Sequence, residues 1–211
     1  MHRYIKKGVS LLLCLSLLFA VTACSKAVAL TEENITKTVA LVEKALRDFD
    51  RDSLQKYVSS KTLNYIFQFA NGKEEFNTLG KLLFEKLEIS VASVDLENNK
   101  VTLQILNRDM AIVGERYSKL LQTRSHGKTA EMLKLLSDDE FLDISLRSLT
   151  AQISRATVPD NPTEVTVGVK QEKKNLVLVF GEEADNAASG GIVKAITEAF
   201  SPTAATTTKQ N

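Results

Sequence analysis

The sequence predicts an α+β fold in which N-terminal helices pack on one side of a curved antiparallel sheet of about four strands. Two segments, 87–105 and 165–180, carry apolar residues in alternation, which is typical of β-hairpins. Between and around them, apolar residues recur at helical spacing. Each hairpin alone would leave one apolar face exposed, so we expect both to join one sheet that the helices cover.

The composition excludes several classes of function. The 211 residues include 27 Lys and Arg against 26 Asp and Glu, which is too little net charge for a tail that binds polyanions. Aromatic residues make up 6% and Trp is absent, which argues against a stacking surface for single-stranded nucleic acid. Two cysteines cannot build a disulfide framework or a Cys-rich zinc site. No nucleic-acid partner is therefore expected.

Four helices are expected first. Thr31 fits an N-cap, and Glu32 and Glu33 follow in the first turn, where negative charge suits the helix dipole. Apolar residues then recur every three or four positions up to Phe49, and the acidic segment 50–52 ends this helix. Three shorter helices are predicted from similar spacing, with these apolar positions: Leu54, Tyr57 and Val58; Leu63, Ile66, Phe67 and Ala70; Phe76, Leu79, Leu82 and Leu83.

The first predicted hairpin contains a shift in phase. Leu87, Ile89 and Val91 alternate with polar residues, but after Ser93 the apolar positions move by one. This pattern indicates either a β-bulge or two short strands. The partner strand follows the turn 97–100, and the second hairpin turns at 171–175.

Helices separate and follow the hairpins. A helical insertion is expected at about 114–155, in which Ser137 and Glu140 fit a capping box. A last helix is expected from Ser189 to 200, after which 201–211 has no large apolar residue and is predicted to be disordered. The segment 31–200 is therefore expected to form a single domain.

The N-terminus has the pattern of an export signal. Three basic residues precede the apolar run 11–21, which is shorter than a membrane-spanning helix, and small residues follow. The segment 21–24 (Val-Thr-Ala-Cys) resembles the lipobox of bacterial lipoproteins. The resemblance implies a signal peptide at 1–23, cleavage between Ala23 and Cys24, a lipid on Cys24 and a lipidated tether at 24–30. The alternative is an ordinary secreted protein with an incidental cysteine.

The lipobox resemblance also implies a location. The mature chain would be held on the extracytoplasmic side of the bacterial cell membrane, because two or more acyl chains anchor a protein stably. In a host with two membranes, Ser25 after the cysteine resembles the pattern that sorts lipoproteins to the periplasmic face of the outer membrane.

A second resemblance concerns the folded domain. The residues Ala45-Leu46 and Phe49-Asp50, followed by Asp52, Leu54, Tyr57 and Val58, resemble the turn between the first two helices of the NTF2-like, or cystatin-like cone, superfamily. The resemblance covers about 31–106 and loosely 163–181, and the helices at 114–155 and 187–200 depart from the family pattern. Because the superfamily includes isomerases, dehydratases and non-catalytic modules, it implies a fold without selecting a function.

Few residues suggest chemistry. His126 lies in a polar segment and reads as an exposed loop residue, and the mature chain has no second His to form a zinc site. The acidic residues at 138–143 are explained by helix capping, and Ser189-Gly190-Gly191 by a flexible start to the last helix. We therefore expect no catalytic residues, no metal and no cofactor.

The aromatic residues Tyr65, Phe67, Phe69 and Phe76 are the remaining candidates. They pack in the core or line an apolar pocket. The resulting hypothesis is a lipid-anchored, non-catalytic binding or interaction module at the cell envelope, with envelope proteins as partners. The alternative is a carrier of a small apolar ligand in a pocket of the cone, and an NTF2-like envelope enzyme ranks third.

Overall fold

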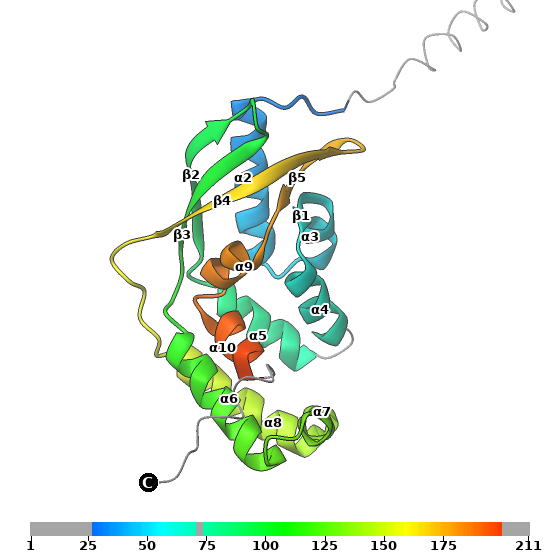
Figure 1. The fold of residues 1–211 in the computed structure, drawn as a ribbon, viewed down its shortest axis with the longest axis vertical. Helices are drawn as coiled ribbons and strands as arrows, with labels where there is room; N and C mark the ends of the chain where they lie inside the picture. The colour runs from blue at the N-terminus through cyan, green and yellow to red at the C-terminus, as the bar shows by residue number, and fades with distance from the viewer. Residues whose placement is uncertain (1–26, 71–73, 200–211) are drawn as a thin grey trace, which may run out of the picture.

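The computed structural model describes residues 27–70 and 74–199, and the side chains of 67–70 and 199 lie outside the description. Within these residues the fold is α+β, as predicted, with nine helices and one five-stranded sheet. The molecule has two ends (Figure 1). At the sheet end a long helix lies beside the strands, and at the helical end three helices pack against one another.

The sheet is mixed, with the strand order β1-β5-β4-β3-β2. The four expected strands are β2 (Glu88–Asp95), β3 (Lys100–Leu106), β4 (Thr163–Glu172) and β5 (Asn175–Val179), and they pair antiparallel. The prediction of about four strands, all antiparallel, was wrong because β1 (Val58–Ser59) adds to β5 in parallel. Two residues are too few to show an alternating pattern, and Val58 also fits the helical spacing before it.

The shift of phase near Ser93 is a β-bulge. The pairing between β2 and β3 changes register between Val91 and Ser93, and β2 continues as one strand on both sides. This outcome excludes the alternative of two short strands. An extra residue in one strand also moves the following side chains to the other face, which is the change seen in the sequence.

The helix α2 (Glu32–Arg47) fills the core at the sheet end. Thr31 caps it by accepting a hydrogen bond from the backbone N–H of Asn34, as predicted. Its apolar stripe, including Ile35, Val42 and Leu46, is fully buried against β2–β5 in what we call the sheet core. The other face of the sheet is polar and carries cross-strand pairs such as Thr102 with Thr166.

Three helices follow α2. Asp50 begins α3 (Arg51–Tyr57) by accepting hydrogen bonds from the N–H groups of Asp52 and Ser53, which explains the acidic turn. The helices α4 (Lys61–Ala70) and α5 (Glu74–Phe84) then lead to β2, as predicted. The residues 71–73 between α4 and α5 lie outside the described residues.

The insertion between β3 and β4 consists of three helices, α6 (Ala111–Ser125), α7 (Thr129–Ser137) and α8 (Asp139–Ile153). A turn with positive φ at His126 and Gly127 separates the first two. The predicted capping box was wrong. Asp138 caps α8 by accepting a hydrogen bond from the N–H of Phe141, while the Ser137 hydroxyl donates to a carbonyl of α7.

Two short helices end the described chain. The expected last helix is α10 (Ile192–Ala199), and an unexpected helix, α9 (Glu182–Ala188), precedes it. The sequence pattern did not predict α9, because this helix buries small residues, Ala184 and Ala188, and not a stripe of large ones. The segment 201–211, predicted to be disordered, lies outside the described residues.

Candidate functional site

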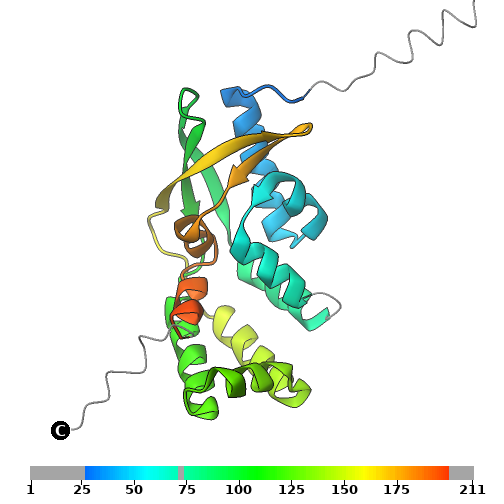
Figure 2. The same ribbon diagram turned by 45° about the vertical axis from the view of Figure 1, so that its right-hand side comes forward.

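An apolar pocket lies at the helical end, between the pair α4 and α5 and the helices α6, α7, α8 and α10. Figure 2 shows α6, α7 and α8 at the end of the molecule farthest from the sheet, with α10 close to α6. The pocket has a volume of about 370 Å³. It lies next to a second, smaller core formed by Met110, Val113, Leu149, Ile153 and Ile192.

The lining of this pocket is apolar almost throughout. The two tyrosines contribute its only polar side-chain atoms among the described residues, and none of its lining residues is charged. The lining comprises Phe49, Tyr65, Ile66, Phe76, Leu79, Gly80, Leu83, Tyr117, Leu121, Leu136, Leu142, Leu146, Leu149, Ile153, Ile192, Val193 and Ile196. A charged group entering this space would lose its hydration without gaining a partner.

Phe49 forms the wall between the pocket and the sheet core. Its backbone has φ of 51°, which turns the chain sharply after α2, and its ring stacks on Phe84 with centroids 6.3 Å apart. The ring lies directly against Gly80, where an added Cβ would sit 2.5 Å from a ring carbon. A glycine on α5 is therefore required for the position of this aromatic wall.

Close packing of α10 on α6 forms another wall. A Cβ at Gly114 would lie 2.7 Å from the Cβ of Ala195, and the Ser118 hydroxyl donates to the Ala195 carbonyl at 2.8 Å. The residues Gly190 and Gly191 before α10 both have positive φ. A Cβ at Gly190 would lie 1.9 Å from the carbonyl oxygen of Arg108, so the interpretation of these glycines as a flexible helix start was wrong.

Tyr117 is the more buried of the two tyrosines that line the pocket. Burial raises the pKa of its phenol. The nearby Ser145 hydroxyl lowers this pKa, but burial has the larger effect. Ser145 is 2% exposed, and its Oγ makes no hydrogen bond of normal geometry to any described residue. The buried Ser145 hydroxyl can therefore accept or donate one further hydrogen bond, and formation of that bond would be favourable.

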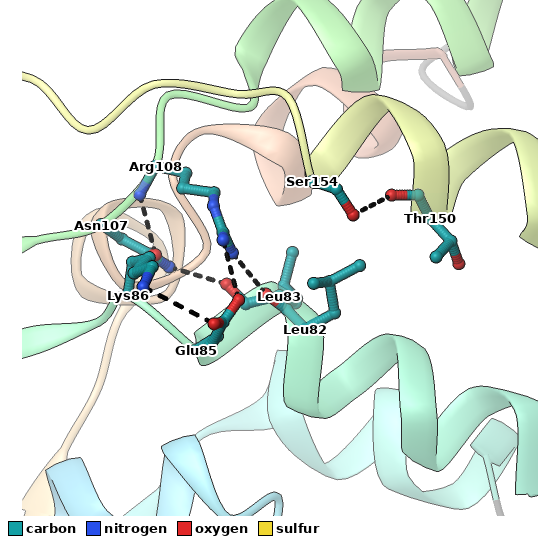
Figure 3. Close-up of polar contacts among 8 residues, drawn as sticks. All are labelled: Leu82, Leu83, Glu85, Lys86, Asn107, Arg108, Thr150 and Ser154. Carbon is teal, nitrogen blue, oxygen red and sulfur yellow. Dashed lines mark hydrogen bonds and ion pairs between the residues drawn. The ribbon is translucent and has the colours of Figure 1, made fainter.

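A polar cluster holds α5 against the end of β3 (Figure 3). The Arg108 guanidinium donates to the Leu82 carbonyl at 3.0 Å and to the Glu85 carboxylate at 2.7 Å. The Asn107 amide donates to the carbonyls of Leu83 and Ala188. The hydrogen bond from Arg108 holds the pKa of Glu85 below its usual value. These contacts satisfy the C-terminal carbonyls of α5, which is a structural role.

A larger hollow of about 600 Å³ opens beside this cluster, between α9 and the adjoining ends of β3 and β4. Its lining is polar and includes the carboxylates of Asp109, Glu164 and Glu183. Asn107 and Arg108 also line it, but their side chains are engaged with α5. We consider the smaller apolar pocket the better candidate, because enclosed apolar walls with few polar groups are typical of ligand sites.

Ser60 and Asp185 form a buried pair of a hydroxyl and a carboxylate. The Ser60 hydroxyl donates to the Asp185 carboxylate at 2.8 Å and accepts from the Leu63 N–H, so it caps α4. Burial raises the pKa of Asp185, which hydrogen bonds from Ser60 and Thr62 partly offset. A triad needs a histidine between the hydroxyl and the carboxylate. His126 is exposed at the end of α6, which excludes it from this pair.

The structure describes the side chains of two of the four predicted aromatic residues. Tyr65 and Phe76 line the apolar pocket, Tyr65 at its rim with 71% of its surface exposed. The side chains of Phe67 and Phe69, and the residues Ala23 and Cys24, lie outside the described part of the chain. The lining also includes five leucines of α5 and α8, whose spacing predicted helices but gave no sign of which helices they face.

Comparisons with other proteins add no family assignment. Neither protein-family models, nor curated proteins, nor solved structures gave a significant match to the chain. Within residues 27–70 and 74–199, no helix combines the length and the hydropathy needed to cross a membrane. In the same ranges, no three His, Cys, Asp or Glu side chains gather as a metal site would require.

Proposed function

We propose that the protein is a lipid-anchored, extracytoplasmic, non-catalytic binding module of the bacterial cell envelope, and that it binds a small apolar ligand in the pocket at the helical end. The observation that supports this best is the pocket of about 370 Å³, whose lining has no charged side chain. Its volume falls within the range of about 300–1,000 Å³ that is typical of small-molecule sites.

The chemistry of the lining defines the ligand class. At about 30 Å³ for each water-sized group, the pocket holds roughly a dozen such groups. An uncharged chain or ring of that size fits the aliphatic walls. A hydroxyl or carbonyl on the ligand would find a partner in the phenol of Tyr117 or Tyr65, which are the polar groups of the lining.

The anchor in this proposal is the lipid on Cys24, supported by the lipobox resemblance and the export signal before it. The membrane would be the outer membrane in a host that has two. Labelling growing cells with an alkyne analogue of palmitate tests this step, and we expect the label on the wild-type chain and none on Cys24→Ala. Equal labelling of both chains would refute lipidation at this residue.

We also propose an NTF2-like fold, which rests on three features. A long α2 ends in the acidic turn, the short α3 follows, and β2 carries a bulge. The ligand site proposed here differs from the expected cone pocket. Ile35, Val39 and Leu46 of α2 already fill the space against the sheet. We therefore place the ligand beside the cone, in the pocket that Phe49 separates from the sheet core.

A protein-interaction module is the second candidate function. Large aliphatic side chains are exposed on all three helices of the insertion, including Ile112 (56%), Leu133 (60%) and Ile144 (61%). Such residues are more common in protein interfaces than on free surfaces when they are contiguous. An NTF2-like envelope enzyme stays the third alternative, and no arrangement of the described residues favours it.

Native mass spectrometry separates these candidates. A chain starting at Ser25, made in bacteria without detergent, should carry an extra small-molecule mass. Leu146→Trp fills the pocket from α8 and should reduce ligand occupancy at least tenfold. Ile144→Trp is the matched control, because it adds the same ring to the exposed face of the same helix. An apo mass for the wild-type chain, together with stably captured proteins, would favour the interaction module instead.

A further inference from the structure

The residues before α2 are held firmly at the sheet end. The Val28 carbonyl accepts a hydrogen bond from the Gln171 amide at 2.6 Å, and the Ala29 carbonyl accepts one from Asn34 at 2.9 Å. The side chains of Val28 and Leu30 pack against the sheet core. Since Gln171 belongs to β4, close to its turn into β5, the chain leaves the domain beside this turn (Figure 1).

The attachment point is therefore close to the lipid. Only four peptide units join Cys24 to Val28, and a fully extended chain of this length spans at most about 14 Å. This step rests on the lipidation of Cys24 that is part of the proposed function. With the lipid in the bilayer, the turn between β4 and β5 cannot lie far from the membrane surface.

The pocket lies at the opposite end of the domain. The 16 residues of α2 extend over about 24 Å, and the pocket begins with Phe49 beyond the C-terminal end of this helix. The helices α6, α7 and α8 lie farther still from the tether (Figures 1 and 2). The tether is thus shorter than the distance between its attachment point and the pocket.

The β4–β5 turn is the basic part of this end, because the start of α2 and the β2–β3 turn carry the acidic residues Glu32, Glu33, Asp95 and Glu97. The turn region 170–174 exposes Lys170, Lys173 and Lys174 against the single acidic residue Glu172. In contrast, the insertion 111–153 carries equal numbers of acidic and basic side chains. A lysine close to an anionic membrane surface contributes about 1 kcal/mol of attraction.

We propose that the β4–β5 turn rests on the anionic lipid headgroups of the anchoring membrane, so that the helical end, which holds the apolar pocket, lies away from that membrane. The domain then stands on its sheet end, held by the tether and by Lys170, Lys173 and Lys174. In this orientation the ligand reaches the pocket from the aqueous compartment and not from the bilayer below.

Site-specific quenching tests the orientation in the full lipidated protein. The protein is reconstituted in vesicles of phosphatidylethanolamine and phosphatidylglycerol that contain a nitroxide-headgroup lipid. A fluorophore is attached to Glu172→Cys at the turn or to Lys134→Cys on α7, since acylated Cys24 leaves the mature chain no other thiol. We expect strong quenching at position 172 and little at position 134. Equal quenching, or stronger quenching at position 134, would overturn the proposal.

Charge reversal tests the role of the lysines. The double variant Lys173→Glu, Lys174→Glu should reduce quenching at position 172 several-fold. The control Lys119→Glu, Lys128→Glu makes the same change of net charge at the helical end and should leave it unchanged. A similar loss with both variants would refute a specific contact of the turn.

Failure of the anchor is distinguishable from failure of this orientation. A chain without lipid would neither float with the vesicles nor incorporate the palmitate analogue, which would refute both proposals. A lipidated chain that floats with the vesicles but shows quenching at position 134 would refute the orientation alone.

Discussion

The turn before α10 gives the sharpest prediction, because Gly190 combines two separate requirements for glycine. Its φ of 59° costs any other residue about 1–2 kcal/mol. Its missing Cβ also leaves room for the Arg108 carbonyl, which an alanine Cβ would approach to 1.9 Å. This contact involves backbone on both sides, so the segment must move, and the hydrogen bond from the Met110 N–H to the Gly190 carbonyl at 2.7 Å would be lost.

The expected loss for Gly190→Ala is therefore more than about 2 kcal/mol of unfolding free energy. The left-handed backbone contributes about 1–2 kcal/mol and the lost hydrogen bond about 1 kcal/mol. Displacement of Ile192, which is 6% exposed, adds part of the roughly 1.5–3 kcal/mol that burial of such a side chain provides.

Two other glycines serve as controls. Gly127 has φ of 70° but no atom within 4 Å of an added Cβ, so Gly127→Ala should cost only about 1–2 kcal/mol. Gly181 has an ordinary extended backbone and equally free space. Gly181→Ala should therefore change stability by less than about 0.5 kcal/mol, because a weaker N-cap and a less flexible unfolded chain offset each other.

Urea denaturation followed by circular dichroism measures all three variants on the same scale. The midpoints should fall in the order Gly181→Ala, Gly127→Ala, Gly190→Ala, from highest to lowest. A Gly190→Ala variant that loses no more stability than Gly127→Ala would show that the approach of the Arg108 carbonyl is not a constraint, and the explanation of this turn would be wrong.

Two further predictions concern the polar clusters. Because burial raises the pKa of Asp185, its contribution to stability should fall as the pH rises from about 4 through its folded pKa. Urea titrations should show a smaller fall for Asp185→Asn, whereas the exposed control Asp160→Asn should follow the wild type. Arg108→Met removes charged hydrogen bonds from a side chain that is 8% exposed, and should cost about 1.5–3 kcal/mol by the same assay. Glu85→Gln should cost less than about 1 kcal/mol, because this partner is half exposed; an equal loss would contradict the assignment of Arg108 to the α5 carbonyls.

Local signals made much of the fold predictable. The apolar stripe of α2 and its cap at Thr31 are confirmed. Both were predictable because the spacing of apolar residues in a long amphipathic helix indicates its buried face, and the capping residue indicates its start. The bulge in β2 was visible for a similar reason, since a shift of register changes which residues are apolar. In contrast, β1 is a two-residue parallel pairing between segments more than 100 residues apart, and no local pattern specifies it.

The candidate site was less predictable than the fold. Leu142, Leu146 and Leu149 formed a clear stripe on α8, but spacing alone does not say whether a stripe meets another helix or a cavity. Gly80 and Gly114 had no special pattern, because their role is to admit an aromatic ring and a neighbouring helix. Such contacts depend on the distance between elements, which one sequence does not encode locally.

The position of the pocket follows from the way the two cores divide the molecule. The stripe of α2 packs against the strands at the sheet end, and Phe49 closes that core toward α5. Leu142 and Leu146 of α8 line the pocket between the insertion and the helices α4, α5 and α10. The pocket is partly open, so part of its apolar lining is exposed to water, at a cost of about 25 cal/mol per Å². An apolar ligand in this space would recover part of that cost, which is the physical reason to look for one.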